Sequence, residues 1–475
     1  MKVSALTLFA FLTAPIASMA TTVNCSDEFK WLKTTFEQND AGFNYAVSKK
    51  GEDLYASHNT ITANAVKQTT DIEQCHAVIR DWLSFFRSGH IGLSIHTSNS
   101  AEQTFSTEIH SFDLPAFKAY LKNKSEEDLE GIWRFSSYTV ALRKEGDVFR
   151  GYITESTNPD WKIGQVKLEI HSAEDASMRA LFYMGDHSAY HIEHITELGK
   201  NAIMLGNDFI VMSRDMPRQE SQPEMKRYVR LLQAEHPSFE RLSNNTVLLR
   251  IPSFNHGYKA QIDAVIKENQ PLIHNTPNLI VDIRGNGGGS DASYASLLPI
   301  LYTNPITTVG VEFLSTPLNN ARMEGFKNHP HLSDDEKQWA KKGYDVLQQH
   351  IGEFVNIGDA INVETFDAVQ PFPSNVAVLI DGNNGSTAEQ FLLAAKQSKK
   401  VKLFGKTTAG VLDISNMHQT TSPSGHFTLH YGLSKSLRIP DMAIDGKGIQ
   451  PDFYFNDTVE NHQWISRTRR LLEGE

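Results

Sequence analysis

The strongest constraint on the fold is an apolar run of strand-forming residues, 376–380, which Gly385 and Ser386 separate from a helix-like segment, 388–396. Continuous apolar runs of this length are typical of strands that are buried on both faces, as in parallel sheets. At the start of a helix, the backbone N–H groups and the helix dipole favour negative charge. The segment therefore predicts an α/β unit that presents the Ser386 hydroxyl at a helix N-terminus.

Two interpretations of Ser386 follow from its position. A nucleophilic serine needs fixed donors nearby, because the oxyanion formed during acyl transfer must be stabilised. The same residues also form a capping-box pattern, in which Ser386 caps the helix and Glu389 returns the bond three residues later. This segment alone leaves both interpretations open.

The C-terminal half of the chain continues the α/β pattern. Strand-like and helix-like segments alternate from about residue 226 onward, which is typical of a largely parallel sheet. A polar stretch, 323–351, is expected to form helices outside this sheet. The other segments with this alternation are 246–251 and 279–283 as strands, and 258–268 and 292–302 as helices.

The N-terminal half has a different organisation. Apolar residues at spacings of three and four predict helices at 27–38, 72–87 and 114–122. Short runs of β-forming residues separated by turns then predict an antiparallel β module, with Trp133 and Trp161 in its core. We therefore expect a helical region over 21–128, the β module over 129–216, a catalytic-type α/β domain over 217–475, and a polar linker at 214–225. The expected β-module strands are 138–142, 149–153, 165–170 and 180–184.

The first 20 residues have the pattern of a cleavable signal peptide. Lys2 precedes a short apolar stretch, and small residues occupy the positions before an expected cleavage after Ala20. The apolar stretch is too short to span a bilayer well, and no later run reaches the length of a transmembrane helix. The net charge of −11, without a long basic cluster, argues against a nucleic-acid partner or an anionic membrane surface. We expect an exported chain without a membrane anchor, either periplasmic or secreted.

The chain contains two cysteines, Cys25 and Cys75. In an oxidising compartment they can form a disulfide that joins the mature N-terminus to a helix. The alternative is two buried thiols. Two cysteines at this spacing do not form a zinc signature.

A second motif closes the strand at 279–283. It reads Asp282-Ile283-Arg284-Gly285-Asn286-Gly287-Gly288-Gly289, and its glycines allow backbone N–H groups to approach a ligand closely. It lacks the spacing of a dinucleotide-binding loop and the Gly-Lys-Ser/Thr of a phosphate-binding loop. A glycine-rich turn remains the alternative. Arg284 is expected to pair with Asp282 or to support the loop, rather than to bind substrate.

Together, the glycine motif and the later Gly-Ser-Thr-Ala-Glu segment resemble the tail-specific protease superfamily of serine peptidases, which includes the C-terminal processing proteases and the tricorn core protease. Three further segments agree with this resemblance, which covers most of residues 226–457 and a patch near residue 90. They are Gly405-Lys406-Thr407-Thr408-Ala409-Gly410, Gly448-Ile449-Gln450-Pro451-Asp452 and Arg87-Ser88-Gly89-His90.

The resemblance implies a crotonase-like or ClpP-like α/β catalytic domain with Ser386 as the nucleophile. The oxyanion hole would consist of the backbone N–H groups of Thr387 and Gly288, with Gly287 as a close second. The chain departs from the processing proteases at Val411, where they carry a general-base lysine. Lys406 lies nearby, but strand alternation does not obviously direct it at Ser386, and a solvated surface lysine is the alternative.

In the tricorn-like branch, a histidine replaces this lysine. A neutral imidazole can accept the serine proton near neutral pH, and His90 matches the histidine of that branch. Asp445 matches the position of the acid that orients the imidazole, although the branch carries Glu there, and Asp413 is the rival acid. Ser88 could fill the place of a serine near the histidine. The alternatives are an ordinary turn histidine and ordinary turn or strand-edge aspartates.

The sequence therefore predicts an exported serine peptidase with a peptide or protein substrate and no metal or organic cofactor. No PDZ-like segment is evident, so specificity for chain ends cannot be transferred from the processing proteases. The alternatives are a binding protein for apolar small ligands on the same scaffold, as in the interphotoreceptor retinoid-binding proteins, and an esterase-type hydrolase. The natural substrate and the oligomeric state are not predicted.

Overall fold

The computed structural model describes residues 23–96, 109–124, 128–172, 177–206, 210–330 and 332–475. The predicted signal peptide, 1–20, lies outside these residues. The chain divides into two compact units, each assembled from separate stretches. One combines residues 1–100, 313–355 and 416–434, and the other combines 101–312, 356–415 and 435–475. None of the helices described has the length and apolar character needed to cross a membrane.

The first unit begins with four helices whose aromatic side chains form its core. Trp82 is fully buried, and its ring packs edge-on against Phe29 and Phe36, with ring centroids 5.4 and 5.8 Å apart. These contacts confirm the helical N-terminal region and explain its apolar spacing. The helices are α1 (Cys25–Asn39), α2 (Phe43–Lys50), α3 (Glu52–Val66) and α4 (Ile72–Ser84).

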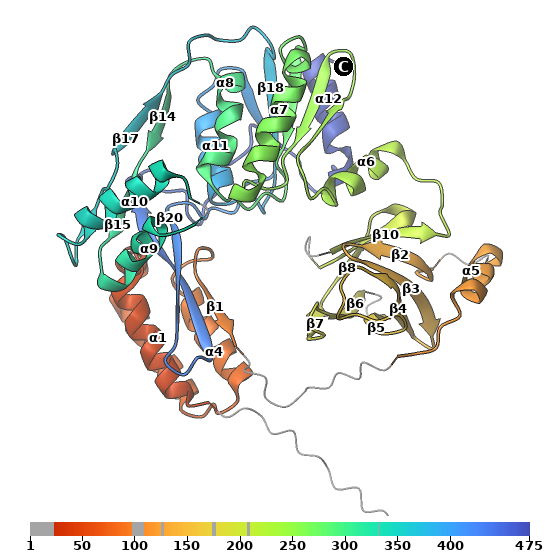
Figure 1. The fold of residues 1–475 in the computed structure, drawn as a ribbon, viewed down its shortest axis with the longest axis horizontal. Coiled ribbons are helices and arrows are strands. Elements are labelled where there is room, and N and C mark those ends of the chain that lie inside the picture. The colour runs from red at the N-terminus through yellow and green to blue at the C-terminus, as the bar shows by residue number, and fades with distance from the viewer. Residues whose placement is uncertain (1–22, 97–108, 125–127, 173–176, 207–209, 331) are drawn as a thin grey trace, which may run out of the picture. The chain divides into compact units, whose positions relative to one another are not determined.

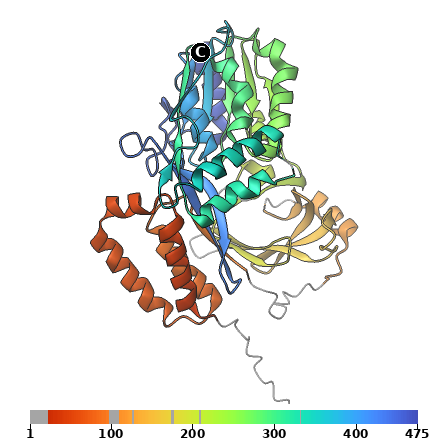
Figure 2. The same ribbon diagram turned by 60° about the vertical axis from the view of Figure 1, so that its left-hand side comes forward.

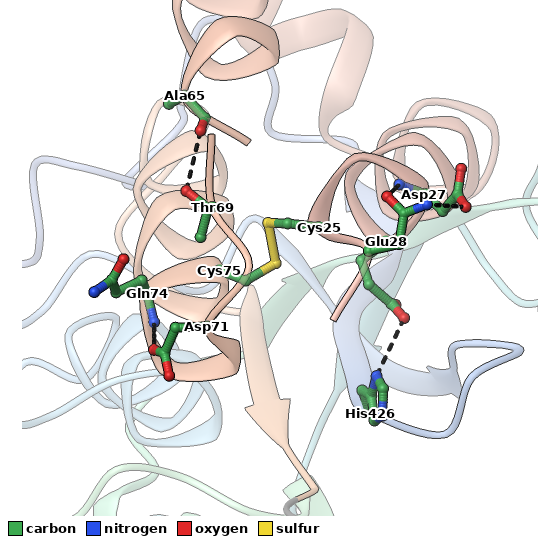
Figure 3. Close-up of a disulfide and its surroundings, with 10 residues drawn as sticks. Cys25, Asp27, Glu28, Ala65, Thr69, Asp71, Gln74, Cys75 and His426 are labelled. Atoms are coloured by element: carbon green, nitrogen blue, oxygen red, sulfur yellow. Dashed lines mark hydrogen bonds and ion pairs between the residues drawn. A yellow bond between two sulfur atoms is a disulfide. The ribbon is translucent and has the colours of Figure 1, made fainter. Parts of the chain in front are cut away.

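A disulfide joins the first and last of these helices. Cys25 at the start of α1 is bonded to Cys75 in α4, so the predicted pairing is confirmed. Figure 3 shows the bond between the two helices, and beside it Glu28 of α1 facing His426 at 3.6 Å. The bond closes a loop with a sequence separation of 50 residues.

A small sheet completes the first unit. Its strand order is β1-β21-β15-β16, with β20 paired to β21, and the register places Leu93 opposite Leu429. Figure 2 shows the long β20–β21 hairpin in blue beside the red helices of residues 25–84. The strands are β1 (Gly92–Ile95), β15 (Val311–Leu314), β16 (Phe354–Val355), β20 (Ile414–Thr421) and β21 (Phe427–Ser436), and the helices α9 (Pro317–Lys327) and α10 (Asp334–Leu347) occupy the predicted helical excursion.

The second unit contains the antiparallel β module. Nine strands follow the order β7-β6-β5-β4-β3-β2-β10-β9-β8. Trp133 and Trp161 are buried in its apolar core, as predicted. The strands are β2 (Gly131–Phe135), β3 (Tyr138–Glu145), β4 (Val148–Ser156), β5 (Val166–Ser172), β6 (Met178–Tyr183), β7 (Ala189–Ile192), β8 (Ile195–Glu197), β9 (Ala202–Leu205) and β10 (Ile210–Met216), and α5 (Leu114–Asn123) precedes them.

The linker predicted at 214–225 is wrong at both ends. Arg214 belongs to β10, where it is paired with Trp133 and is buried over the tryptophan ring. Residue 223 begins helix α6 (Pro223–Leu232), with proline at its first position. The prediction rested on the polar composition of this stretch. Composition does not reveal that the aliphatic stem and guanidinium of Arg214 pack against the face of the Trp133 ring.

The α/β part of the second unit is built on a six-stranded sheet in the order β11-β12-β13-β18-β19-β22. All neighbours run parallel except β11 and β12. All residues of β12 and β13 are buried, which explains the apolar residues 247–249 and 279–281 at their centres. The strands are β11 (Ser238–Arg241), β12 (Thr246–Arg250), β13 (Asn278–Asp282), β18 (Asn375–Ile380), β19 (Val401–Gly405) and β22 (Phe453–Tyr454).

Helices cover both faces of this sheet (Figure 1). One apolar cluster joins α7, α8 and α11 to the sheet through residues such as Ile262, Leu301 and Phe391. A second cluster, around Trp464, joins α6 and α12 to the other face. The helices are α7 (Lys259–Ile273), α8 (Leu298–Leu301), α11 (Thr387–Ala395) and α12 (Trp464–Glu473), and a 3₁₀ segment, η3 (Asp291–Leu297), precedes α8.

Candidate active site

Ser386 occupies a strained turn between β18 and α11. Its backbone has φ 56° and ψ −124°, an uncommon conformation for a residue with a side chain. Its hydroxyl makes no capping hydrogen bond to the helix. Such strain persists only where the surrounding structure enforces it, and it is often found at functional sites.

Hydrogen bonds of Asn384 enforce this turn. The fully buried Asn384 accepts a bond from the Asp381 N–H at 2.8 Å and donates to the carbonyl oxygens of Ile283 and Asn286 at 2.5 and 3.0 Å. The Asn384 amide therefore ties the end of β18 to the glycine motif after β13. The turn and the glycine loop are held as one structure.

The capping-box interpretation of Ser386 and Glu389 is wrong. The Glu389 carboxylate is fully buried, and its bonding partners lie in another loop. It accepts hydrogen bonds from the Thr408 hydroxyl at 2.5 Å, the Gly410 N–H at 2.7 Å and the Val411 N–H at 2.8 Å. Glu389 thus fixes the 408–411 loop, because a buried carboxylate needs such donors. The Ser386 hydroxyl also makes no helix-capping bond, so neither half of the capping box is present.

The glycine loop lies directly against Ser386. A β-carbon added at Gly288 would stand 2.8 Å from the Thr387 nitrogen and 2.9 Å from the Ser386 β-carbon, so only glycine fits. The Gly288 N–H is donated to Asn286 Oδ1 at 3.0 Å. Within the described part of the chain, the N–H groups of Gly287 and Thr387 have no acceptor. An unbonded N–H is expected at Thr387, because the first N–H groups of a helix lack intrahelical partners.

A buried ion pair supports the other end of this loop. Arg284 contacts Asp282 with two nitrogens, at 2.9 and 2.8 Å, and donates to the Asn461 carbonyl oxygen. Burial opposes ionisation of Asp282, but the charges of Arg284 and Arg250 outweigh it and hold its pKa below the usual range. The predicted structural role of Arg284 is confirmed.

Val411 is in contact with the nucleophile turn. A β-carbon added at Gly385 would lie 2.6 Å from Val411 Cγ2, so this side chain fills the space beside the residue before Ser386. Valine cannot accept a proton at this place. Lys406 is partly exposed and pairs with the exposed Asp457 at 2.7 Å, which confirms the surface-lysine interpretation.

The two candidate acids, Asp445 and Asp413, each accept hydrogen bonds from backbone N–H groups of the loop that carries the other. Asp445 accepts the N–H groups of Asp413 and Ile414 at 2.6 and 3.2 Å. Asp413 is fully buried and accepts bonds from Arg438 at 3.0 Å and from the Ile444 and Asp445 N–H groups at 2.5 and 2.8 Å. Asp413 is therefore a structural residue that fixes the loop carrying Asp445.

His90 lies in the first unit, between α4 and β1, and has a positive φ of 53°. Arg87 donates to the carbonyl oxygens of Gly89 and His90 at 3.0 and 2.7 Å. The same guanidinium binds both carboxylate oxygens of Asp40, at 2.8 and 2.5 Å. Ser88 is an exposed residue of this turn.

Within one unit, the structure thus brings together Ser386, Thr387 and Gly288, and it places Asp445 on a neighbouring loop. His90 and Ser88 belong to the other unit. Sequence reasoning missed the scaffolding roles of Asn384 and Arg87. Asn384 directly precedes the Gly-Ser segment and so gave a local signal, whereas the partners of Arg87 are remote in sequence. Among the described residues, no cluster of three or more His, Cys, Asp or Glu side chains could hold a metal ion.

Comparisons with known proteins concern the part of the chain that contains these residues. Residues 245–455 match the family model of Peptidase family S41. This region of the chain is therefore similar to the tail-specific protease superfamily of serine peptidases. The match covers Ser386, the glycine motif and Asp445, and it identifies a serine-type peptidase, whose substrates are peptides or proteins. No curated protein matches the chain.

Solved structures support the fold. The structure of mature CPAF complexed with lactacystin has a TM-score of 0.52 at 13% identity, and the alignment covers 95% of this chain and 99% of that one. The tricorn protease aligns at a TM-score of 0.42 and 12% identity, over 95% of this chain and 36% of its own. The second similarity is too low to carry an argument. The α/β fold class of the crotonase-like or ClpP-like type, preceded by a helical region and an antiparallel module, is confirmed.

Proposed function

We propose that this chain is an exported serine peptidase that cleaves peptide bonds through an acyl-enzyme. Ser386 Oγ attacks the scissile carbonyl carbon, and its proton passes to His90 and then to the leaving amine. Water subsequently cleaves the ester by the reverse proton path. The observation that carries this proposal is the strained Ser386, uncapped and packed against Gly288 at the start of α11.

The oxyanion would be held by backbone N–H groups. Thr387 provides one, at the positive end of the helix dipole. A glycine-loop N–H provides the other, from Gly288 or Gly287. The Gly288 N–H already donates to Asn286, so it would have to be shared between Asn286 and the oxyanion. The Gly287 N–H would not have to be shared in this way.

Asp445 would orient the His90 imidazole, with Ser88 as a further hydroxyl near it. A carboxylate has about four acceptor positions, and the backbone N–H groups of Asp413 and Ile414 bind at two of those of Asp445. Asp413, which receives three buried donors, is less suited to this role. The signal-peptide pattern and the disulfide support export to the periplasm or the medium.

The test is labelling of the purified mature protein with a fluorophosphonate probe. Wild type should be labelled, and both Ser386→Ala and His90→Ala should abolish labelling. Arg80→Lys, an exposed change on α4, is the control. Labelling that persists in Ser386→Ala would refute the nucleophile. Labelling that is lost only in Ser386→Ala would keep the nucleophile and reject His90 as its base.

A further inference from the structure

The β module contains a buried lysine surrounded by aromatic rings. Lys167 on β5 is only 1% exposed. Its Nζ atom lies 3.8 Å from the Trp161 ring centroid, 4.0 Å from that of Tyr138 and 5.0 Å from that of Phe182. Lysine is rarely buried without a charged partner, so this position needs an explanation.

The hydrogen-bonding capacity of this amine is only partly used. Nζ donates to the Met184 carbonyl oxygen at 3.3 Å, and an ammonium group has two further donors. Within the described part of the chain, no carboxylate lies within ion-pair distance of Lys167. The aromatic faces attract the cation but do not replace an anionic partner.

Lys167 also lines an open cavity of about 780 Å³. The neighbouring wall is aromatic and aliphatic, and is formed by Phe135, Tyr138, Phe182 and Met184 together with Ile210 and Val211. Its charged lining consists, besides Lys167, of the paired Arg134 and Asp215 and of Arg218 and Glu235. The size is that of ligand sites, which are mostly apolar with a few polar groups that fix orientation.

The charged groups near the Lys167 amine do not neutralise it fully, so an anion could bind there. Burial lowers the pKa of Lys167 to about 7, against a weak opposing attraction from Asp186. Asp186 itself is bound to Ser188 at 2.6 Å. His187 stacks on the Trp161 ring at 4.1 Å, and burial, then the Lys167 charge, lowers its pKa. A ligand carboxylate would supply the missing counter-charge.

We propose that the β module binds an apolar monocarboxylate in this cavity, with the carboxylate on Lys167 Nζ and the apolar part against the Phe135–Tyr138–Phe182 wall. This site is separate from Ser386 and does not depend on the peptidase mechanism. The same chemistry occurs in free apolar acids and in the last residue of an apolar peptide.

The test is calorimetric titration of the full-length mature protein with decanoate and, as a neutral comparator, decanol. Wild type should bind decanoate at least tenfold more tightly than decanol. Lys167→Met should lose at least tenfold in decanoate affinity, and Lys144→Met, an exposed lysine over Phe149 on the same module, should bind like wild type. N-acetyl-Leu-Phe and its amide distinguish the sources: tighter binding of the free-acid peptide than of decanoate assigns the site to chain ends.

A second measurement tests the proposal on the wild-type protein, without the Lys167→Met variant. In wild type with ¹⁵N-labelled lysine, the titration midpoint of the Lys167 amine should move to higher pH when decanoate is added. Equal binding of decanoate and decanol, unchanged affinity in Lys167→Met, or an unmoved midpoint would each overturn the proposal. Binding in the Ser386→Ala variant should equal that of wild type, so failure here is distinct from failure of the peptidase proposal.

Discussion

Arg87 donates an N–H from Nη2 to the carbonyl oxygen of His90 at 2.7 Å. The guanidinium that makes this bond is itself held by the buried carboxylate of Asp40, which also accepts the N–H groups of Gly42 and Gly432. The positive φ of His90 is therefore enforced by a two-residue support that reaches from the end of α1 to the turn after α4. This support lies entirely within one unit.

The first prediction concerns this support. Arg87→Lys keeps the charge but removes the planar fork, so the bond to His90 and the two-pronged contact with Asp40 cannot both be made. If His90 is the base, the rate of fluorophosphonate labelling should fall about tenfold or more, since small misplacements of catalytic groups are costly. The pH midpoint of labelling should also move. Arg80→Lys should change neither, and an unchanged rate and midpoint in folded Arg87→Lys would contradict the positioning role.

Gly288→Ala should remove most activity. The new methyl group would stand 2.8 Å from the Thr387 nitrogen and the Gly385 oxygen, so the turn that holds Ser386 must shift. Loss of one oxyanion donor typically costs about 10²–10³ in kcat, and a comparable loss is expected here. Gly285→Ala is the matched control, because it has a similar positive φ but no atom within 4 Å of the added carbon. Equal activity in the two variants would show that the space beside Ser386 is not needed.

Glu389→Gln should weaken the structure without removing the nucleophile. In wild type, the Glu389 carboxylate accepts three hydrogen bonds. The variant replaces one carboxylate oxygen with an NH₂ group, which would face an N–H or hydroxyl donor instead of accepting from it. A buried mismatch of this kind costs about 1–3 kcal/mol. Denaturant unfolding should show this loss, with faster hydrogen exchange at residues 408–411. Ser386 should still react with the probe in the folded fraction, and abolished labelling without loss of stability would instead make Glu389 a catalytic group.

The stability of the β module should rise with pH above neutrality. Burial lowers the pKa of Lys167 from its ordinary value of 10.5 to about 7, so between these values the unfolded chain binds more protons than the folded one. The unfolding free energy therefore increases as pH rises from about 7 toward 10.5, and the contribution is constant below 7. Lys167→Met should be more stable than wild type at pH 7, and this difference should shrink by pH 9.5. A constant difference across this range would show that the lysine is charged throughout.

Local sequence predicted those elements whose chemistry is carried by neighbours along the chain. The apolar runs at 279–283 and 376–380 specify strands buried on both faces, and the glycine motif specifies a loop that approaches closely. The helices at 25–39 and 72–84 follow from the spacing of apolar residues. The disulfide between Cys25 and Cys75 follows from the oxidising compartment that the sequence predicts. Predictions were wrong where the contacting residue is remote in sequence. Arg214 was assigned to a linker because Trp133, over which it packs, lies on another strand.

Sequence by itself thus indicated the type of chemistry, because the glycine motif closely follows the strand at 279–283 and Ser386 closely follows the strand at 376–380, so each segment imposes its backbone conformation locally. Only the tertiary structure decided what each acid does. Glu389, Asp413 and Asp445 are all carboxylates near the end of a loop or the start of a helix, and their roles depend on which N–H groups fold against them. A carboxylate's function is set by its donors in space, and long-range packing alone brings those donors together.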